Sequence, residues 1–224
     1  MSIKDWPKAD QPRERLLRSG PEPLSDSELM AVVFGSGGAG KSAFDLGRTL
    51  LLRSGSIRAA LAMDCRSFCE IQGMGPSRWA QLAAATELTR RSLREQLGES
   101  DALGNQATVR QFLTLWLRDR PFECFSCLFL DSRHRLIEAR ELFRGTLTQT
   151  AVYPREIARS VLMLNAAAVI LSHNHPSGIA QASVADRALT EAVKQALHSI
   201  DVPVLDHLII AGNQCLSFAE RGWI

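Results

Sequence analysis

The sequence predicts an α/β fold in two parts: a C-terminal domain with a mixed sheet flanked by helices, and a small all-α domain before it. First, helix caps and glycine-rich turns mark the N-terminal half. Second, from residue 123 onward a strand pair is followed by alternating helical and strand segments, which is typical of α/β domains. Third, residues 97–105 mix Gly, Glu, Ser, Asp and Asn, which we interpret as a linker. We therefore expect domains at residues 1–101 and 102–224.

Composition excludes several classes of protein. Of the 224 residues, 46% are hydrophobic and 22% are charged, as in soluble globular proteins. No apolar run approaches membrane-spanning length and the N-terminus lacks a signal-peptide core, so we expect no membrane partner. Five cysteines without an export signal indicate free thiols in a reducing cytoplasm. The net charge of +2 does not by itself indicate nucleic-acid binding, so any basic patch must be local.

The N-terminal domain is predicted to consist of short helices and one long helix. Ser25 and Glu28 form a capping-box pattern, so a helix starts there and continues through Phe34. The other expected helices are a short one at Arg13–Arg18, one at residues 65–72, and a long one that ends near Arg91.

Residues 35–42 match the phosphate-binding P-loop pattern G-x-x-x-x-G-K-S letter for letter, with Lys41 as its lysine. A P-loop lies between a strand and a helix, so that backbone amides surround the phosphates. The segment before this one begins with a helix cap instead. A partner aspartate, Asp131, is explained by a turn in the C-terminal domain. We therefore interpret the match as a coincidence.

Gly73-x-Gly75 lies between two helical segments and resembles a helix-hairpin-helix, a module whose backbone amides bind nucleic-acid phosphates. Residues 38–44 can be aligned with residues 73–79 as a degenerate first copy. Gly73, Gly75 and Arg78 are then the candidate nucleic-acid contacts, and we expect weak, sequence-tolerant DNA binding. The alternative is a plain helix–helix connection.

The C-terminal domain is predicted from its strand and helix patterns. Thr108 is expected to cap a helix over Val109–Leu117. Two strands, Glu123–Leu130 and Arg135–Phe143, form a hairpin around the turn at Asp131–His134. The remaining elements are a helix at Pro154–Asn165, a strand at Ala166–Leu171, a helix at Ala185–Ile200, a strand at Val204–Ile210 and a short strand at Cys215–Ser217.

Two cysteine pairs are discounted as metal or redox sites. Cys124 and Cys127 are three residues apart on a predicted strand, so their side chains point to opposite faces. Cys65 and Cys69 can share a helix face, but no other cysteine or histidine lies near them in the sequence.

His173 and His175 follow an apolar strand and leave an extended chain on the same side. Two imidazoles on one face can bind a divalent metal such as zinc. After a Pro/Gly turn, Ser183 opens a helix and Asp186 lies in its first turn. Asp186 can complete a set of two histidines and one carboxylate, with a position open for water. His-x-His alone is common, and Ser183 with Asp186 is also a capping box, but the conjunction favours a metal site.

These residues resemble a known signature. His173-x-His175-Pro176 followed by Ser183-x-x-Asp186 is similar to the JAMM (MPN+) metallohydrolase motif. A wider similarity, over nearly the whole chain, is to the RadC family of bacterial proteins. The segments that carry it are Phe143–Thr146, Tyr153–Glu156, Asn165–Gly178, Leu205–Leu208 and Ser217–Gly222. The sequence departs from the family at Gln181-Ala182, where an acidic residue and a proline are usual.

The resemblance implies a JAMM/MPN-type C-terminal domain with Zn²⁺ held by His173, His175 and Asp186. It also implies that Glu123, which opens the first strand, is the general base, and that Ser183 hydrogen-bonds near the oxyanion.

Several other polar residues compete with these assignments. The rival bases are Glu138, Glu141 and Glu156, and Glu123 itself could be only an edge-strand charge. Asp206 and His207 are adjacent on a strand and face opposite sides, so we interpret them as structural.

The function expected from the resemblance is zinc-dependent hydrolysis of the peptidase or isopeptidase type. An unknown peptide or protein is the substrate, and the N-terminal domain binds DNA. The alternative is a DNA-binding, repair-associated accessory protein whose metal site is structural or vestigial.

Overall fold

The computed structural model describes residues 6–145 and 152–224 of the chain. The chain packs as two compact units, which divide between Thr89 and Arg90. This division lies within helix α6 (Pro76–Glu99) rather than at residues 101/102. Leu97 explains the difference, because its side chain is buried in the core of the second unit. Within residues 97–105, Leu97 and Ala102 pack into this core, whereas most of the other residues are exposed.

The first unit is built from helices over the residues described. They are the 3-10 helix η2 (Lys8–Asp10), α1 (Pro12–Ser19), α2 (Asp26–Phe34), α3 (Ala43–Ser54), α4 (Ile57–Ala62), α5 (Cys65–Cys69) and the start of α6. The predicted capping box is confirmed: the Ser25 hydroxyl accepts from the Glu28 amide, and the Glu28 carboxylate accepts from the Ser25 amide. Leu46, Leu50 and Phe68 are fully buried in the core of this unit.

The P-loop look-alike connects two helices, α2 and α3, so the strand that a P-loop requires is replaced by a helix. Gly38 and Lys41 pair through their backbones, with N···O distances of 2.9 and 3.0 Å. Ser42 caps α3, and its hydroxyl donates to the Asp45 carboxylate at 2.6 Å. These contacts occupy groups that a P-loop would turn toward phosphates, which supports the interpretation of the match as a coincidence.

In its described residues, the second unit contains the rest of α6, three further helices and a five-stranded sheet. The elements are α7 (Gln106–Leu117), β1 (Cys124–Leu130), β2 (Leu136–Arg144), α8 (Pro154–Leu164), β3 (Ala168–Asn174), α9 (Val184–His198), β4 (Val204–Ala211) and β5 (Gln214–Ser217). The predicted cap of α7 is wrong by three residues. Asn105 is the N-cap and its side chain accepts from the Thr108 amide, because asparagine is a strong N-cap and Thr108 lies one turn later.

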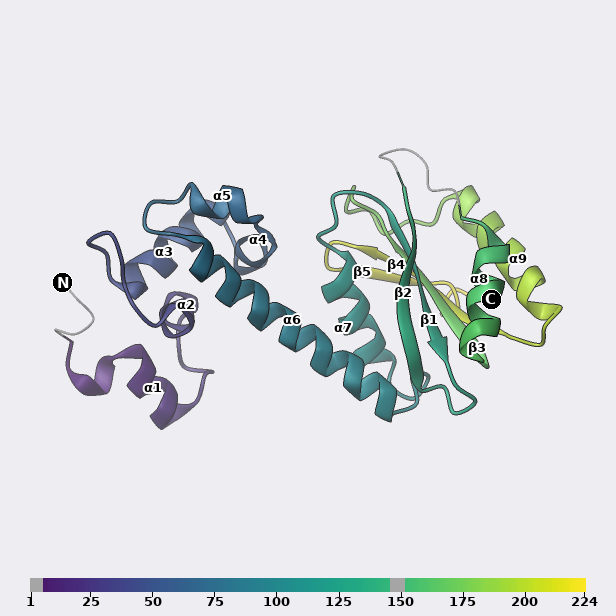
Figure 1. Ribbon diagram of the computed structural model, residues 1–224, viewed down its shortest axis with the longest axis horizontal. Coiled ribbons are helices and arrows are strands. Elements are labelled where there is room, and N and C mark those ends of the chain that lie inside the picture. Colours follow the sequence, from purple (N-terminus) through teal and green to yellow (C-terminus); the bar gives the residue numbers. More distant parts are fainter. Residues whose placement is uncertain (1–5, 146–151) are drawn as a thin grey trace. The chain divides into compact units, whose positions relative to one another are not determined.

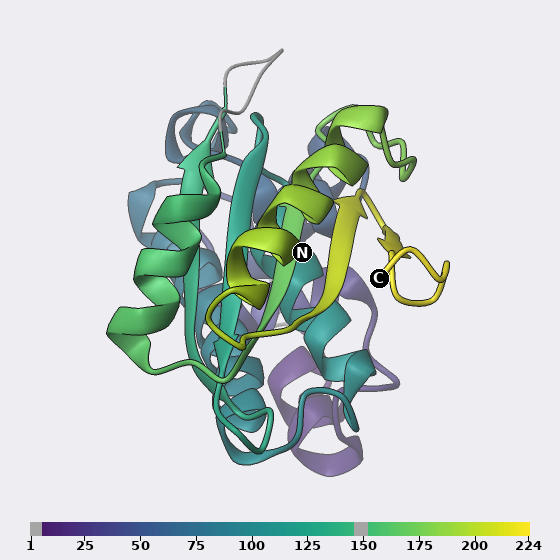
Figure 2. The same ribbon diagram turned by 90° about the vertical axis from the view of Figure 1, so that its right-hand side faces the viewer.

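The sheet is mixed, as predicted, with the strand order β2-β1-β3-β4-β5. Strand β3 pairs antiparallel with β1 and parallel with β4, whereas β2 and β5 are antiparallel edge strands. Helix α7 covers one face, and α8 and α9 cover the other (Figures 1 and 2). Because both faces are covered, every residue of β1 and β3 is buried.

Strand alternation decides which side chains enter which layer. On β1, Cys124 and Leu128 pack with α7, whereas Phe125 and Cys127 pack with α8 and α9. The two cysteines of β1 therefore point to opposite faces, as predicted. Strand β3 extends three residues beyond the apolar run ending at Leu171, which brings His173 into the sheet.

The sequence predicts that no segment spans a membrane. Within residues 6–145 and 152–224, none of the helices combines the length and the apolar character needed to cross a membrane.

Candidate metal centre

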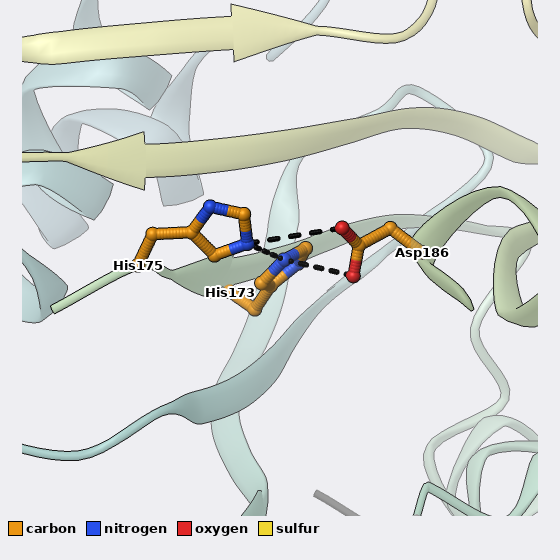
Figure 3. A group of neighbouring side chains, drawn as sticks. All are labelled: His173, His175 and Asp186. Atoms are coloured by element: carbon orange, nitrogen blue, oxygen red, sulfur yellow. Dashed lines mark hydrogen bonds and ion pairs between the residues drawn. The ribbon is translucent and has the colours of Figure 1, made fainter. Parts of the chain in front are cut away.

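His173, His175 and Asp186 meet where β3 ends and α9 begins (Figure 3). The Nε2 atoms of the two histidines are 2.9 Å apart. The Asp186 carboxylate lies 3.2 Å from His173 Nε2 and 3.7 Å from His175 Nε2, through its two different oxygens. The structure thus brings together the three residues predicted as ligands.

Local structure explains why these three side chains converge. The two histidines leave the end of β3 on one side because side chains alternate along a strand. Gly178 then turns the chain with a φ of 77°, and its amide donates to the His175 carbonyl at 3.0 Å. Ser183 caps α9, and Asp186 accepts from the Ser183 amide and hydroxyl at 2.7 Å each. The cap holds the carboxylate facing the imidazoles.

Each imidazole has its Nδ1 atom engaged away from the cluster. His175 Nδ1 lies 3.0 Å from the Ile179 carbonyl oxygen and therefore donates to it. His173 Nδ1 lies 2.8 Å from Nε2 of the buried His207. These contacts fix the ring orientations and leave both Nε2 atoms facing Asp186, as in many metal sites with histidine ligands.

The donors and acceptors among Thr190, His207 and His173 can be assigned from the backbone carbonyl of Asp186. The Thr190 hydroxyl is 2.6 Å from the Asp186 carbonyl oxygen, which can only accept. The same hydroxyl therefore accepts from His207 Nδ1 at 2.6 Å. His207 Nε2 then carries the lone pair and accepts from His173 Nδ1–H, so His173 Nε2 keeps a free lone pair for a metal.

The electrostatics agree with a neutral His207. Burial, and then the neighbouring His173, hold the pKa of His207 well below its usual range. Burial alone would raise the pKa of Asp186, but the neighbouring His173 imidazole and the hydrogen bonds from Ser183 outweigh it and hold that pKa well below the usual range. Asp186 is therefore an ionised carboxylate that faces two imidazole nitrogens and can act as a metal ligand.

The three donors fit a divalent metal such as zinc. Zinc–nitrogen bonds of about 2.0–2.1 Å in a tetrahedron place neighbouring donor atoms about 3.3 Å apart. The 2.9 Å between the two Nε2 atoms and the 3.2 Å between His173 Nε2 and Asp186 Oδ1 are close to that value, and Asp186 Oδ2 lies 3.7 Å from His175 Nε2. Two neutral imidazoles and one carboxylate are also the donor types that catalytic zinc sites use, with one position left for water.

Glu123 lies just before β1, next to the cluster in the order of the sheet. Phe125 pairs with His173 across β1 and β3, and their rings are stacked with centroids 6.3 Å apart. This is the last pair of the ladder; a register continued by two more residues would put Glu123 opposite His175 and on the same face. The backbone of Glu123 is held from β2, because the Gly145 amide donates to its carbonyl at 2.8 Å.

The three rival glutamates are each paired with arginine. Glu138 binds Arg140, Glu141 binds Arg144, and Glu156 lies within 4 Å of Arg155 and Arg159. Within the part of the chain that the structure describes, the carboxylate of Glu123 has no such partner. Its role as the base stays a prediction.

Ser183 has two contacts that define its structural role. Its hydroxyl proton goes to the Asp186 carboxylate, and its oxygen accepts from the Asp186 amide at 3.1 Å. The hydroxyl is therefore part of a capping box that orients a metal ligand. Its contribution near an oxyanion stays a prediction, and it requires that proton to change partner.

The residues predicted to contact nucleic acid lie in the first unit. Gly73 has a φ of 88°, and a Cβ there would lie 2.7 Å from Leu46 Cδ2, so the backbone conformation and the packing together favour glycine. No atom lies within 4 Å of a Cβ built on Gly75. The Arg78 guanidinium donates to the carbonyls of Gly73, Ser36 and Gly37 at 2.9–3.0 Å. Arg78 thus joins the two glycine-rich loops, and its nucleic-acid contact stays a prediction.

The two glycine-rich loops are neighbours but do not share one conformation. Within residues 38–44 the positive φ values are at Ala39 and Gly40, whereas within residues 73–79 the positive φ is at Gly73. The alignment of residues 38–44 with 73–79 therefore reflects a common position between helices rather than an equal backbone.

Sequence reasoning missed the residues that support the centre. His207 and Thr190 orient His173, although His207 looked only structural. Asp206 agrees with its structural interpretation, because its carboxylate accepts from the His207 and Ala219 amides and the Ser217 hydroxyl. The strand–helix–strand order favours β4 beside β3, but spacing in the sequence does not give the register that brings His207 to His173.

Comparison with known proteins agrees with this architecture. Residues 103–223 match the family model described as a RadC-like JAB domain, and residues 3–80 match the model described as UPF0758 N-terminal. UPF0758 proteins from Nitrosospira multiformis and Aeromonas hydrophila are 53% and 51% identical over 224 residues, covering all of both chains. One from a Janthinobacterium species is 51% identical over 222 residues, covering 99% of each chain. The chain therefore belongs to the RadC family, and its C-terminal unit is a RadC-like JAB domain.

Proposed function

We propose that the C-terminal unit is a zinc-dependent hydrolase of the peptidase or isopeptidase type. One observation carries the proposal: the Nε2 atoms of His173 and His175 and the Asp186 carboxylate converge within 4.8 Å of one another. Three protein ligands leave a coordination position for water, which distinguishes catalytic from structural zinc sites. Membership of a family with a JAB-like hydrolase fold supports the same reaction class.

Each residue has its own role in the proposed reaction. Zinc held by the two histidines and Asp186 would supply the Lewis acid that activates a water molecule. Glu123 accepts the proton of the attacking water and delivers it to the leaving nitrogen of the substrate. Ser183 fixes Asp186 and, once its proton changes partner, donates to the developing oxyanion.

The test separates the residue that binds the ion from the residue that moves a proton. Metal analysis should find about one Zn²⁺ per chain in the wild type and in Glu123→Gln, and much less in His175→Ala, because a stable catalytic site needs three ligands. Cleavage of a peptide and isopeptide library should fall by ~10²-fold or more in Glu123→Gln. Glu156→Gln is the matched control and should keep wild-type activity.

Three results would contradict parts of the proposal. Equal zinc content in the wild type and His175→Ala would remove the metal site. Loss of zinc in Glu123→Gln would make Glu123 a ligand and close the position needed for water. Full activity in Glu123→Gln together with loss in Glu156→Gln would transfer the role of base to Glu156.

We also propose that the first unit binds DNA weakly and without sequence preference. The open space around Gly75 supports this proposal, because a phosphate can approach the backbone there. A gel-shift assay of the full chain with labelled duplex should show binding at low salt that weakens as salt increases. No shift at low salt would contradict it.

A further inference from the structure

Asn174 lies between the two histidines of the centre and is fully buried, with 0% of its surface exposed. Because side chains alternate along β3, the Asn174 side chain leaves the strand on the side opposite the imidazoles. It is therefore not a metal ligand. A buried amide costs free energy unless its donors and acceptor are paired, so its partners indicate what it does.

Within the described residues, the Asn174 side chain bonds to backbone groups of the segment from Arg120 to Cys124, which contains Glu123. Its Oδ1 accepts from the Cys124 amide at 2.7 Å. Its Nδ2 donates to the Phe122 carbonyl at 3.0 Å and to the Arg120 carbonyl at 3.4 Å. The amide thus binds the residue before Glu123 and the residue after it.

These bonds take over where the backbone ladder ends. The backbone pairing of β1 with β3 ends with Phe125 and His173. Beyond that pair, the Asn174 side chain supplies the hydrogen bonds that a longer β3 would have made to Cys124 and Phe122. On the other side, the Gly145 amide holds the Glu123 carbonyl. The backbone at Glu123 is therefore fixed from β2 and from β3 together.

We propose that Asn174 is the positioning residue for Glu123. The C-terminal end of β3 then carries the two histidine ligands and also fixes the position of the base. The inference rests on the proposed function, because it assigns Glu123 as that base. Its physical reason is that a shift of about 1 Å in a catalytic group can cost about 10²-fold in rate. Holding Glu123 through the residue between His173 and His175 makes the base and the ligands move together.

The test needs no substrate and uses Co²⁺ in place of Zn²⁺ in the full chain. The pH midpoint of the visible Co²⁺ spectrum reports ionisation next to the ion. The negative charge of Glu123 disfavours a second negative charge nearby, so Glu123→Gln should lower that midpoint by roughly one pH unit. Asn174→Ala should lower it in the same direction, because Glu123 is no longer held beside the ion, while about one metal ion per chain is retained.

A matched control lies two residues earlier on the same strand. Ser172 is also fully buried, and its hydroxyl is 2.7 Å from that of Ser126 on β1. Ser172→Ala therefore removes a buried side-chain bond between the same two strands, but at a distance from Glu123. It should leave the pH midpoint unchanged. Asn174→Thr is the second test variant. Threonine is favourable in a strand, but its shorter side chain cannot make the hydrogen bonds of Asn174 to the backbone of residues 120–124.

Each outcome decides one question. If Glu123→Gln leaves the midpoint unchanged, the assignment of Glu123 as base is wrong. If Glu123→Gln shifts the midpoint and both Asn174 variants match Ser172→Ala, the positioning role is wrong and the proposed function stands. Loss of bound metal in the Asn174 variants, or failure of both to fold, would also overturn the proposal, because Asn174 would then support the ligands or the whole sheet.

Discussion

Around His173 the orientation of a metal ligand depends on three polar groups that a metal would not touch. The Asp186 carbonyl sets the Thr190 hydroxyl, Thr190 sets His207, and His207 sets the proton on His173. This chain returns to α9, whose first turn also carries the Asp186 carboxylate. Two of the three predicted ligands are thus oriented through the same helix.

We predict that His207→Ala weakens zinc binding without removing a ligand. His173 would lose the acceptor that fixes its ring and tautomer, and the loss of such a partner typically costs 10–100-fold in metal affinity. Competition with a chelator of known affinity measures the change. His198→Ala, at the exposed end of α9, is the control and should bind zinc as the wild type does. An unchanged zinc affinity in His207→Ala would show that His173 is oriented by other contacts.

At the scale of elements, the two glycines of the hairpin differ in their surroundings. Gly73 combines a positive φ with a Cβ position that overlaps the buried Leu46, whereas Gly75 has open space. We predict that Gly73→Ala lowers the free energy of unfolding by about 1–3 kcal/mol, because strain and overlap add. Gly75→Ala should leave stability near that of the wild type but weaken DNA binding, because its methyl group covers the backbone. Denaturant unfolding and gel shifts measure the two effects.

The reverse pattern would be informative. If Gly75→Ala binds duplex as tightly as the wild type at low salt, the hairpin is a plain helix connection. Nucleic-acid contact would then have to come from another part of the chain.

The cap of α2 predicts a pH dependence of stability. Burial would raise the pKa of Glu28, but hydrogen bonds from Ser25 and the ion pair with Arg15 outweigh it and hold that pKa below its usual range. A lowered folded-state pKa contributes stability that is fully present above the unfolded-state pKa of about 4.3. That contribution is lost as the pH falls through the lower folded-state pKa.

Glu28→Gln isolates this contribution because glutamine keeps the shape of the capping box but has no charge. The wild type should melt at a higher temperature than Glu28→Gln at pH 7, and the difference should shrink as the pH falls below about 4.3. Thermal unfolding followed by circular dichroism measures both proteins at each pH. A difference that stays constant with pH would show that the Glu28 charge does not stabilise the cap.

At the scale of the whole molecule, each unit has its own hydrophobic core. The metal ligands all lie in the second unit and the glycine-rich loops all lie in the first. We therefore predict that removing zinc with a chelator leaves the DNA affinity of the full chain unchanged, while any hydrolysis is lost. Gel shifts of metal-free and zinc-loaded protein at equal salt measure this. A zinc-dependent shift would indicate that the centre itself takes part in DNA binding.

Local spacing in the sequence was enough to predict most elements and the ligand set. Capping boxes at Ser25 and Ser183 mark helix starts because their hydrogen bonds join residues only three apart. His173 and His175 share a side because strand alternation is also local. Asp186 then lies near them because a short turn returns the chain. Each of these relations spans fewer than fifteen residues, so the sequence alone determines it.

The tertiary structure decided what depends on distant segments. His207 contacts His173 because β4 pairs with β3. Asn174 binds the backbone around Glu123 because β1 pairs with β3. Arg78 was predicted to face a phosphate, but the fold brings three carbonyls to its guanidinium. The boundary between the units lies in α6, because Leu97 packs in a core made of residues that come later in the chain. The physical reason is common to all four: burial and pairing between strands or loops are set by the whole fold, whereas caps and alternation are set by neighbours.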